Sequence, residues 1–360
     1  MQPAFVRVAY LTLAAAAVAA CSDAGPGATR PPEFAEATAS KFAVAKATVR
    51  VIPGLDGLSP AALNDSDEIV GNDTINGPWR WTQAKGLVRL PFAPHAYGIA
   101  TSVSDNGGIG GSVGDTIGTT HGVVWLPNLA VHIFPLDDSS LVFIGFYTSC
   151  GIRSINVYGQ MASTCEGRFP IGDTFNWHGP TVPTGPGGIL NAISDDGWMG
   201  GQSASLGTQE GPILISPAGQ VITLLDHNDQ VDPLSDVHAV TLHGWAAGSS
   251  QEGTCTQAVA WLSNPGQTYP EFRLGVCGEA YGITDDWYVI GTGTTDGSFN
   301  QSTLFAFVWF PGPGTQTLPG LGTTGETSVA VGINKLHHVI GTITSGGVTH
   351  VVIWNVAQRT

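Results

Sequence analysis

The sequence predicts an all-β fold, a seven-bladed β-propeller with four-stranded blades. Three observations support this prediction: the composition, an internal repeat and the likeness of the two chain ends. The chain has 360 residues, of which 11% are charged, 42% are hydrophobic and 49 are glycine. This composition suits short strands joined by tight turns, whereas helix interiors favour Ala, Leu, Glu and Lys. The length fits one large β domain.

The repeat consists of an apolar strand, an Asp/Asn/Gly turn, a second apolar strand that ends in Gly, and a later strand that ends in Trp. The first copy runs from Ala62 to Trp81. The strand-ending glycines recur every 40 to 50 residues, at Gly71, Gly111, Gly159, Gly201, Gly248, Gly291 and Gly341. Four strands in about 45 residues are typical of a propeller blade, whereas a β-solenoid has a shorter period.

A second anchor marks the end of the third strand in the same seven units. Its residues are Trp81, Trp125, Trp177, Ile215, Trp261, Trp309 and Trp354. One such unit cannot bury both faces of its small sheet, so neighbouring units must pack against each other. We therefore expect the repeated Trp side chains in the core between blades.

The two chain ends predict how the ring closes. The chain ends in the third strand of the seventh unit, so that unit lacks a fourth strand. The segment Thr48–Leu55 resembles Thr315–Leu321, which is the fourth strand of the sixth unit. We expect the N-terminal strand to complete the last blade, which would remove both open sheet edges.

The units resemble HAF repeats, which occur in extracellular bacterial proteins. The shared pattern is Ala-x-x-Ile-Asn, a turn, a small apolar run that ends in Gly, and His-Ala-Phe-x-Trp. The last element appears here at Thr120–Trp125, Phe305–Trp309 and Thr349–Trp354. The resemblance covers nearly all of residues 46 to 356. It implies propeller-type repeats and an extracellular location, and it implies no defined reaction.

The N-terminus predicts export and lipidation. Residues 1–20 read as a signal peptide, with Arg7 before an apolar run from Val8 to Ala20 that is too short to span a bilayer. The sequence Val18-Ala19-Ala20-Cys21 resembles the lipobox of bacterial lipoproteins, which implies a lipid on Cys21. Ordinary signal cleavage that leaves Cys21 free is the alternative. Residues 21–44 then form a flexible tether and residues 45–360 the propeller, in the cell envelope at the outer membrane or cell surface.

Four further cysteines remain, Cys150, Cys165, Cys255 and Cys277. An even number in an exported chain suggests two disulfides, with three possible connectivities. We favour Cys150 with Cys165 and Cys255 with Cys277, because each pair would join loops on the same rim of the propeller. No CxxC sequence is present, and we predict no zinc site.

The remaining candidate residues fit structural roles. The carboxylates in Asn64–Glu68 could ligate calcium, but Asp and Asn are also the residues that tight turns require. His121 and His350 stand at a repeated position, which favours packing over catalysis. Trp79, Trp198, Trp245 and Trp287 lie outside the Trp anchor and are candidates for an exposed aromatic platform. No nucleophile elbow, HExxH or P-loop occurs, so we predict no catalytic residue, metal or cofactor.

Two functions remain open. The net charge of −15 and the lack of a basic stripe disfavour nucleic-acid binding. The first hypothesis is a monomeric platform, held at the membrane by its lipid, that binds a protein or glycan ligand. Its binding loops would be the least repetitive ones, residues 127–147, 166–188, 226–237 and 292–303. The second is a polysaccharide hydrolase or lyase with its site at the propeller channel, which rests on analogy between folds.

Overall fold

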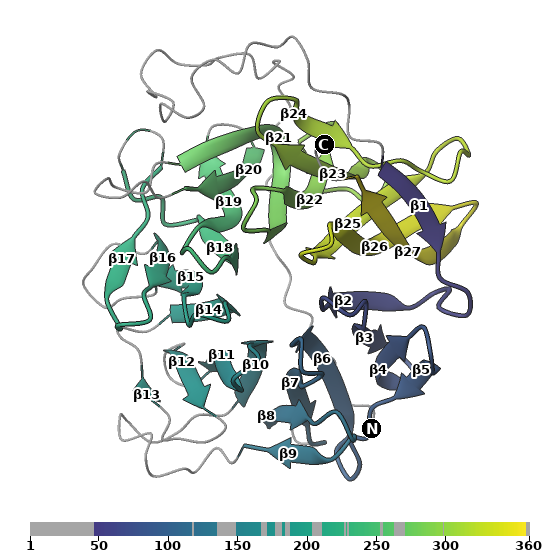
Figure 1. Cartoon of the computed structure of the whole chain (residues 1–360), viewed down its shortest axis with the longest axis vertical. Helices are drawn as coiled ribbons and strands as arrows, with labels where there is room; N and C mark the ends of the chain where they lie inside the picture. The colour runs from purple at the N-terminus through teal and green to yellow at the C-terminus, as the bar shows by residue number, and fades with distance from the viewer. Residues whose placement is uncertain are drawn as a thin grey trace, which may run out of the picture.

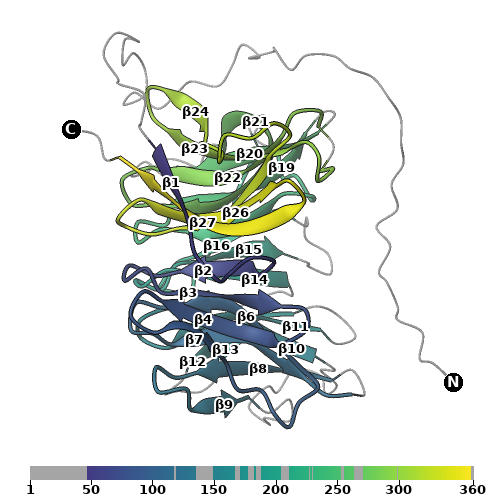
Figure 2. The same ribbon diagram turned by 90° about the vertical axis from the view of Figure 1, so that its right-hand side faces the viewer.

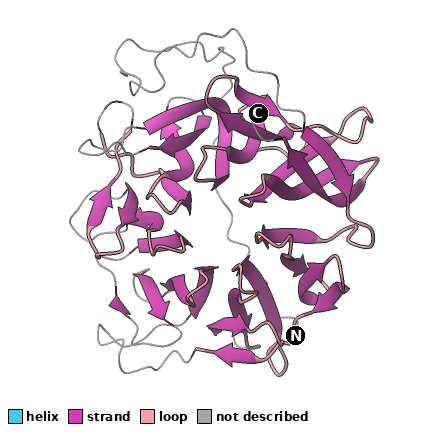
Figure 3. Cartoon of the chain, viewed as in Figure 1, coloured by secondary structure: helices cyan, strands magenta, loops and turns pink. Residues whose placement is uncertain are grey.

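The structure is a computed structural model, in which strands joined by turns make up the fold (Figure 3). It describes residues 47–116, 119–134, 149–166, 171–176, 182–183, 188–203, 211–226, 228, 230–252, 255–262, 271–297 and 299–357. Within these ranges, no helix is long and apolar enough to cross a membrane.

Three of the sheets have four strands each, and all their pairings are antiparallel. The first is β2 (Ser59–Leu63), β3 (Ile69–Asp73), β4 (Gly77–Thr82) and β5 (Gly86–Arg89). The second is β14 (Gly188–Ile193), β15 (Met199–Ser203), β16 (Gly211–Ile215) and β17 (Val221–Thr223). The third is β25 (Thr327–Ile333), β26 (His338–Ser345), β27 (Val348–Val356) and β1 (Ala47–Val51).

Two larger sheets complete the fold. An eight-stranded sheet contains β6 (Tyr97–Val103), β7 (Ile109–Gly114), β8 (Thr120–Trp125), β9 (Val131–Ile133), β10 (Ser149–Ile155), β11 (Gln160–Glu166), β12 (Ile171–Asn176) and β13 (Val182–Pro183). Its two halves are linked by a single pairing of Ser149 with Thr120. A seven-stranded sheet contains β18 (Asp236–Val240), β19 (Ala246–Glu252), β20 (Cys255–Trp261), β21 (Glu271–Ile283), β22 (Val289–Thr294), β23 (Leu304–Phe310) and β24 (Gly314–Thr317).

These sheets form a β-propeller. They stand around a common centre and follow one another in sequence order (Figure 1), and the side view shows them stacked face to face (Figure 2). The predicted pairing of the N-terminal strand is confirmed: β1 pairs with β27, from Ala47 with Val356 to Val51 with Val352. This pairing covers the outer edge of β27 and holds strands from both parts of the chain in one sheet, in which β1 is the outermost strand.

Except in the third unit, the repeated glycines lie on the second strand of each unit, opposite a β-bulge in the innermost strand. The first strand of each unit contains a β-bulge, and the residue before the bulge pairs with the repeated Gly, as Ala330 pairs with Gly341. A Cβ on Gly341 would lie 1.9 Å from the carbonyl oxygen of Val329. The same crowding recurs at Gly71, Gly111, Gly201, Gly248 and Gly291, where a Cβ would lie 1.9 to 2.2 Å from a backbone oxygen.

One unit departs from the predicted register. Gly159 is predicted to end the second strand of its unit, but it lies in the turn between β10 and β11 with a φ of +75°. The residue that pairs with Ile152 before the bulge is Ser163. Asn156 and Gly159 match the turn pattern of the other units. The predicted glycine anchor is therefore wrong in this unit, because Gly159 belongs to the turn and lies four residues before Ser163.

The repeated Trp side chains are core residues, as expected. Trp125, Trp261 and Trp354 are fully buried, and each indole N–H donates to a backbone carbonyl, which for Trp354 is that of Pro319 at 2.8 Å. Trp177 lies outside the described residues, and the residue that pairs with Met161 at the equivalent position is Phe175.

The hydrophobic core lies between neighbouring sheets rather than within one of them. One cluster contains Tyr288, which directly precedes β22, and Phe310, the last residue of β23. These two side chains pack against Ala330, Val339 and Trp354 of the following sheet. Another joins residues of β3 and β4 to residues of β26 and β27. Each sheet therefore depends on packing against its neighbours for stability. This packing holds the inner strands in place around the central channel.

Candidate ligand-binding site in the central channel

The central channel is lined by the innermost strands β2, β6, β10, β14, β18, β21 and β25 and by the turns that follow them. It has two compartments, a mouth of about 230 Å³ on the turn side and a deeper cavity of about 310 Å³. The last residue of each inner strand lines both. We call this set the collar: Leu63, Val103, Ile155, Ile193, Val240, Ile283 and Ile333. The collar is an apolar layer between two polar compartments.

The second residues of the seven turns form a set that we call the mouth ring, and all of them except Val157 line the mouth. Its members are Asp65, Asp105, Val157, Asp195, Leu242, Asp285 and Lys335. The four Asp carboxylates bind neighbouring turns, as when the backbone N–H of Asp65 donates to Oδ1 of Asp105 at 2.8 Å. The other three such bonds run from Lys335 to Asp65, from Val157 to Asp195 and from Leu242 to Asp285. These carboxylates therefore join successive units of the ring.

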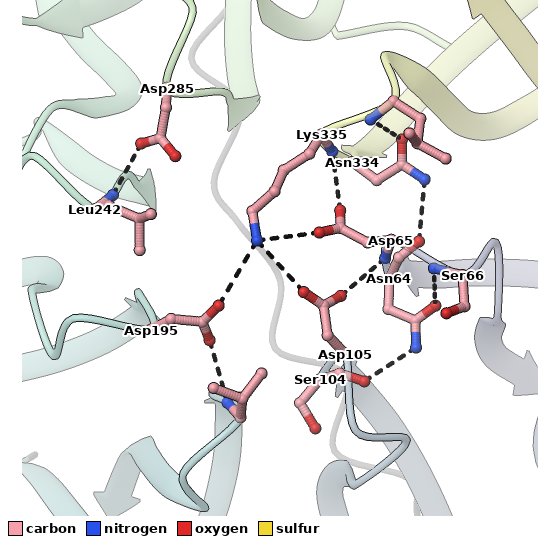
Figure 4. Close-up of polar contacts among 12 residues, drawn as sticks. Asn64, Asp65, Ser66, Ser104, Asp105, Asp195, Leu242, Asp285, Asn334 and Lys335 are labelled. Atoms are coloured by element: carbon pink, nitrogen blue, oxygen red, sulfur yellow. Dashed lines mark hydrogen bonds and ion pairs between the residues drawn. The ribbon is translucent and has the colours of Figure 1, made fainter.

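Lys335 lies among three of these carboxylates (Figure 4). Its Nζ is 3.0 Å from Asp65, 3.4 Å from Asp105 and 3.8 Å from Asp195. Partial burial disfavours the ammonium, but the hydrogen bond and charge of Asp65, with the charges of the other two, raise the pKa of Lys335. Burial likewise opposes ionisation of Asp65, yet hydrogen bonds from Lys335 lower its pKa. Burial raises the pKa of Asp105, since the bond from Asp65 offsets it only in part.

The carboxylates once considered for calcium are engaged with protein cations or with turns. Glu68 lies 2.5 Å from the guanidinium of Arg80, and Asp67 lies 2.7 Å from Nδ1 of His338. The Asn64 side chain accepts from two N–H groups of its own turn and donates to the carbonyl of Ser104. Among the described residues, no group of three or more His, Cys, Asp or Glu is placed to hold a metal ion.

The deeper compartment is lined by the bulge residues of the inner strands. We call this set the bulge ring: Ala61, Thr101, Arg153, Asn191, His238, Tyr281 and Val331. A bulge residue is left out of the ladder and can be aimed away from the sheet. The ring is asymmetric, because four consecutive inner strands carry Arg, Asn, His and Tyr while the other three carry Ala, Thr and Val.

Three bulge residues have a structural role. Each donates to the carbonyl that precedes the next bulge around the ring: Thr101 to Ile152 (2.6 Å), Asn191 to Val237 (3.0 Å), and Nδ1 of His238 to Ala280 (3.1 Å). Arg153 and Tyr281 make no such bond in the described part of the chain. These two side chains therefore line the channel but do not bond one unit to the next.

Charged and aromatic groups gather around the bulge residues of β14, β18 and β21. Asp236 accepts from the Asn191 amide at 2.9 and 3.0 Å and lies 3.6 Å from Nε2 of His238. The His238 and Tyr281 rings are stacked with centroids 5.3 Å apart, and the Tyr281 hydroxyl donates to Glu279. Burial disfavours the imidazolium, but the hydrogen bond and charge of Asp236 raise the pKa of His238. Burial and the Glu279 charge raise the pKa of Tyr281, so its hydroxyl keeps its proton.

The structure decides several of the residue predictions. Cys255 and Cys277 form a disulfide, with Cα atoms 5.8 Å apart, although both cysteines lie in strands rather than in loops. Cys150 and Cys165 are directly paired residues of β10 and β11, and the bond between them stays a prediction. Cys21 lies outside the described residues.

The predicted aromatic platform is wrong in part. Trp79 is fully buried, because it pairs with Gly71 and packs between sheets. Trp245 and Trp287 are half-buried and pack against each other, with ring centroids 4.5 Å apart. The predicted binding loops at residues 127–147 and 166–188 lie in large part outside the described residues.

Sequence reasoning missed the bulge ring. Each of its residues lies three positions before the Asn, Ser or Thr that opens the turn, as Arg153 precedes Asn156 and Tyr281 precedes Thr284. In that position the polarity varies from unit to unit while the flanking positions stay apolar or small. This contrast was present in the sequence, but only the register of the bulge shows that these residues face one cavity.

No protein-family model matches the chain, and no curated protein matches it. The β-propeller domain of Cps50 (Swd1) from Myceliophteria thermophila is 12% identical, with a TM-score of 0.46 over 87% of this chain and all of that one. YCF48 bound to D1 peptide is 11% identical, with a TM-score of 0.49 over 88% of this chain and 99% of that one. TolB from Acinetobacter baumannii is 12% identical, with a TM-score of 0.42 over 80% of this chain and 82% of that one.

Proposed function

We propose that this protein is a seven-bladed propeller, held at the cell envelope by a lipid on Cys21, which binds a ligand in its central channel. The blade count is supported by the seven inner strands with one bulge each in the described residues. In this count β21 serves two blades, because Glu271–Cys277 pairs with β20 and Gly278–Ile283 pairs with β22. The HAF-type repeat pattern supports the same count.

The lipid anchor rests on the apolar run that ends in Val18-Ala19-Ala20-Cys21 and on the tether that follows it. In a bacterial host, the wild-type chain should fractionate with membranes and carry acyl chains on its N-terminal peptide. Cys21→Ser should appear in the soluble fraction, whereas Ser22→Ala should stay with the membranes. Equal membrane association of the Cys21→Ser chain, or an N-terminal peptide without lipid mass, would rule out the anchor.

The bulge ring carries the proposal of a channel site. The fold explains why a bulge occurs in each inner strand, but it does not require Arg153 and Tyr281, which make no bond to the next unit in the described residues. Concave sites with a few convergent polar groups and an aromatic side chain are the usual form of ligand pockets. The charged and aromatic side chains lie on one side of the cavity, which makes the site asymmetric.

The test is binding of the full chain, purified in detergent, to arrays of oligosaccharides and of peptides. At least one immobilised probe should be retained by the wild type and lost by the Arg153→Ala/Tyr281→Ala double variant. The matched control is Arg89→Ala/Tyr158→Ala, which removes the same residue types from exposed positions outside the channel. Retention by the channel variant equal to that of the control would exclude the channel as the binding site. Shortened products from a bound oligosaccharide would make the protein an enzyme instead.

A further inference from the structure

On the basis of the proposed channel site, we infer that the deeper compartment binds an acidic saccharide. Arg153 pairs with the carboxylate of the sugar, and Tyr281 contacts the sugar ring. Both residues line the compartment, together with Asn191 and His238. The inference concerns the ligand class and depends on three features of the compartment, which are a cation without a partner in the described residues, an aromatic face, and room on the opposite side.

Arg153 is the unpaired cation of the channel. Its side chain is exposed, and within the described residues it has no ion pair or hydrogen bond. The chain has only 13 Lys and Arg against 28 Asp and Glu, and other cations such as Arg80, Arg89 and Lys335 lie beside carboxylates. A guanidinium that stays free in so acidic a protein is available to an anionic ligand, and its planar donor pair matches a carboxylate.

Tyr281 and His238 form the aromatic part of the wall. Their rings are nearly parallel, with an interplanar angle of 14°, and both side chains are half-buried at the cavity. The stack and the Glu279 bond to the hydroxyl hold Tyr281 in one orientation. A fixed, half-exposed ring can pack against the C–H face of a sugar at a small cost in side-chain entropy.

The polar wall is held in place by carboxylates behind it. Asp236 accepts from the Asn191 amide and Glu279 accepts from the Tyr281 hydroxyl, although neither carboxylate lines the compartment itself. A sugar hydroxyl or carboxylate in the compartment can accept from the guanidinium of Arg153, whose N–H groups have no partner within the described residues.

The other side of the compartment provides room. Its bulge residues are Ala61, Thr101 and Val331, which are small and lie on consecutive inner strands. The mouth ring of carboxylates lies on the far side of the collar, so its negative charge does not face this cavity. An anionic ring can therefore enter from the side where the inner strands begin and lie against the polar wall.

The experiment is calorimetric titration of the full chain in detergent with a trimer of galacturonic acid and with a trimer of galactose. The acidic trimer should bind more tightly, and its affinity should fall as salt increases. Arg153→Met should weaken the acidic trimer about 10- to 100-fold and leave the neutral trimer almost unchanged, as expected for loss of a charge-assisted bond. Arg153→Lys should recover part of the affinity, and Arg89→Met should have no effect.

Three kinds of outcome distinguish a failure of this inference from a failure of the proposed function. Equal affinity for both trimers, or an Arg153→Met variant that binds the acidic trimer normally, overturns the saccharide inference. A peptide probe that needs Arg153 and Tyr281, while neither trimer binds, overturns the saccharide inference and supports the channel site. Correctly folded channel variants that retain every probe bound by the wild type overturn both.

Discussion

Glu271 should make the protein less stable at neutral pH than at mildly acidic pH. This residue begins β21 and is only 7% exposed. Burial raises the pKa of its carboxyl group to about 7, and the negative charges of Asp226 and Asp232 act in the same direction while a hydrogen bond with Ser250 opposes them. Arg273 lies 3.5 Å from Oε1, and Oε2 has no hydrogen-bond partner in the described part of the chain.

The size of the effect follows from the difference in proton binding. An unfolded Glu titrates at 4.5 and the folded one at about 7. Between these values the folded state holds a proton that the unfolded state has lost, so the free energy of unfolding falls by about 1.4 kcal/mol per pH unit. The total loss is about 3 kcal/mol by neutral pH. Below the unfolded pKa both states are protonated, and the residue has no effect on the slope.

Glu271→Gln keeps the shape of the side chain and removes its titration. Denaturant unfolding near pH 4 should give similar free energies for variant and wild type, whereas near pH 8 the variant should be more stable by about 3 kcal/mol. Glu326→Gln is the control of opposite sign, because hydrogen bonds from Thr323 lower the pKa of Glu326 and its stabilisation is lost as the pH falls. Parallel pH profiles for wild type and Glu271→Gln would refute the reasoning.

Three further changes test the ring. Gly341→Ala should prevent the bulge in β25 and lower the thermal midpoint markedly, because its Cβ would meet a backbone oxygen at 1.9 Å; an unchanged midpoint would contradict this. Lys335→Met should lower the denaturation midpoint at low salt, since it leaves the mouth carboxylates uncompensated, and added salt should restore much of the loss. Replacing Cys255 and Cys277 by Ser opens a loop with a sequence separation of 22, which should cost about 3 kcal/mol in equilibrium unfolding, and reductant should destabilise the wild type more than the double variant.

Most of the fold was predictable because a propeller repeats one packing problem. The strand-ending glycines recur where a side chain would strike a backbone oxygen, and the Trp anchors recur where a large ring fills the space between sheets. The pairing of β1 with β27 was predictable because an open edge must be covered. Such repeated constraints leave a sequence pattern that needs no homologue for its detection.

The wrong predictions concern positions where this chain meets the packing requirements of the repeat with a different residue. Ser163 stands where the other units have Gly, so the glycine of the preceding turn was taken for the anchor. Trp79 was expected at the surface because it breaks the Trp pattern, but its side chain lies over Gly71, where a Cβ would come within 2.4 Å of the indole. The bulge ring could not be predicted from the sequence, because its residues come from different units and meet only in the closed propeller.

The hydrogen bond to the carbonyl that precedes the next bulge can come from the bulge residue or from a residue of the second strand. The bulge residue can therefore vary where the second strand supplies this bond. Ala61 is too short to reach the next unit, and Asn72 on β3 replaces it, donating to the carbonyl of Ala100 and accepting from its N–H, both at 2.8 Å. Thr292 does the same for Ala330, which frees Tyr281 for the channel.

Asn72→Ala should therefore cost about 3 kcal/mol in equilibrium unfolding, because it leaves two buried backbone groups of Ala100 unpaired. Adding Ala61→Asn should recover part of this loss, since Asn at the bulge of β14 already bonds the equivalent carbonyl of Val237 at 3.0 Å. Ala61→Asn alone should change stability little. If the double variant is no more stable than Asn72→Ala, the two positions are not interchangeable, and the variation among bulge residues needs another explanation.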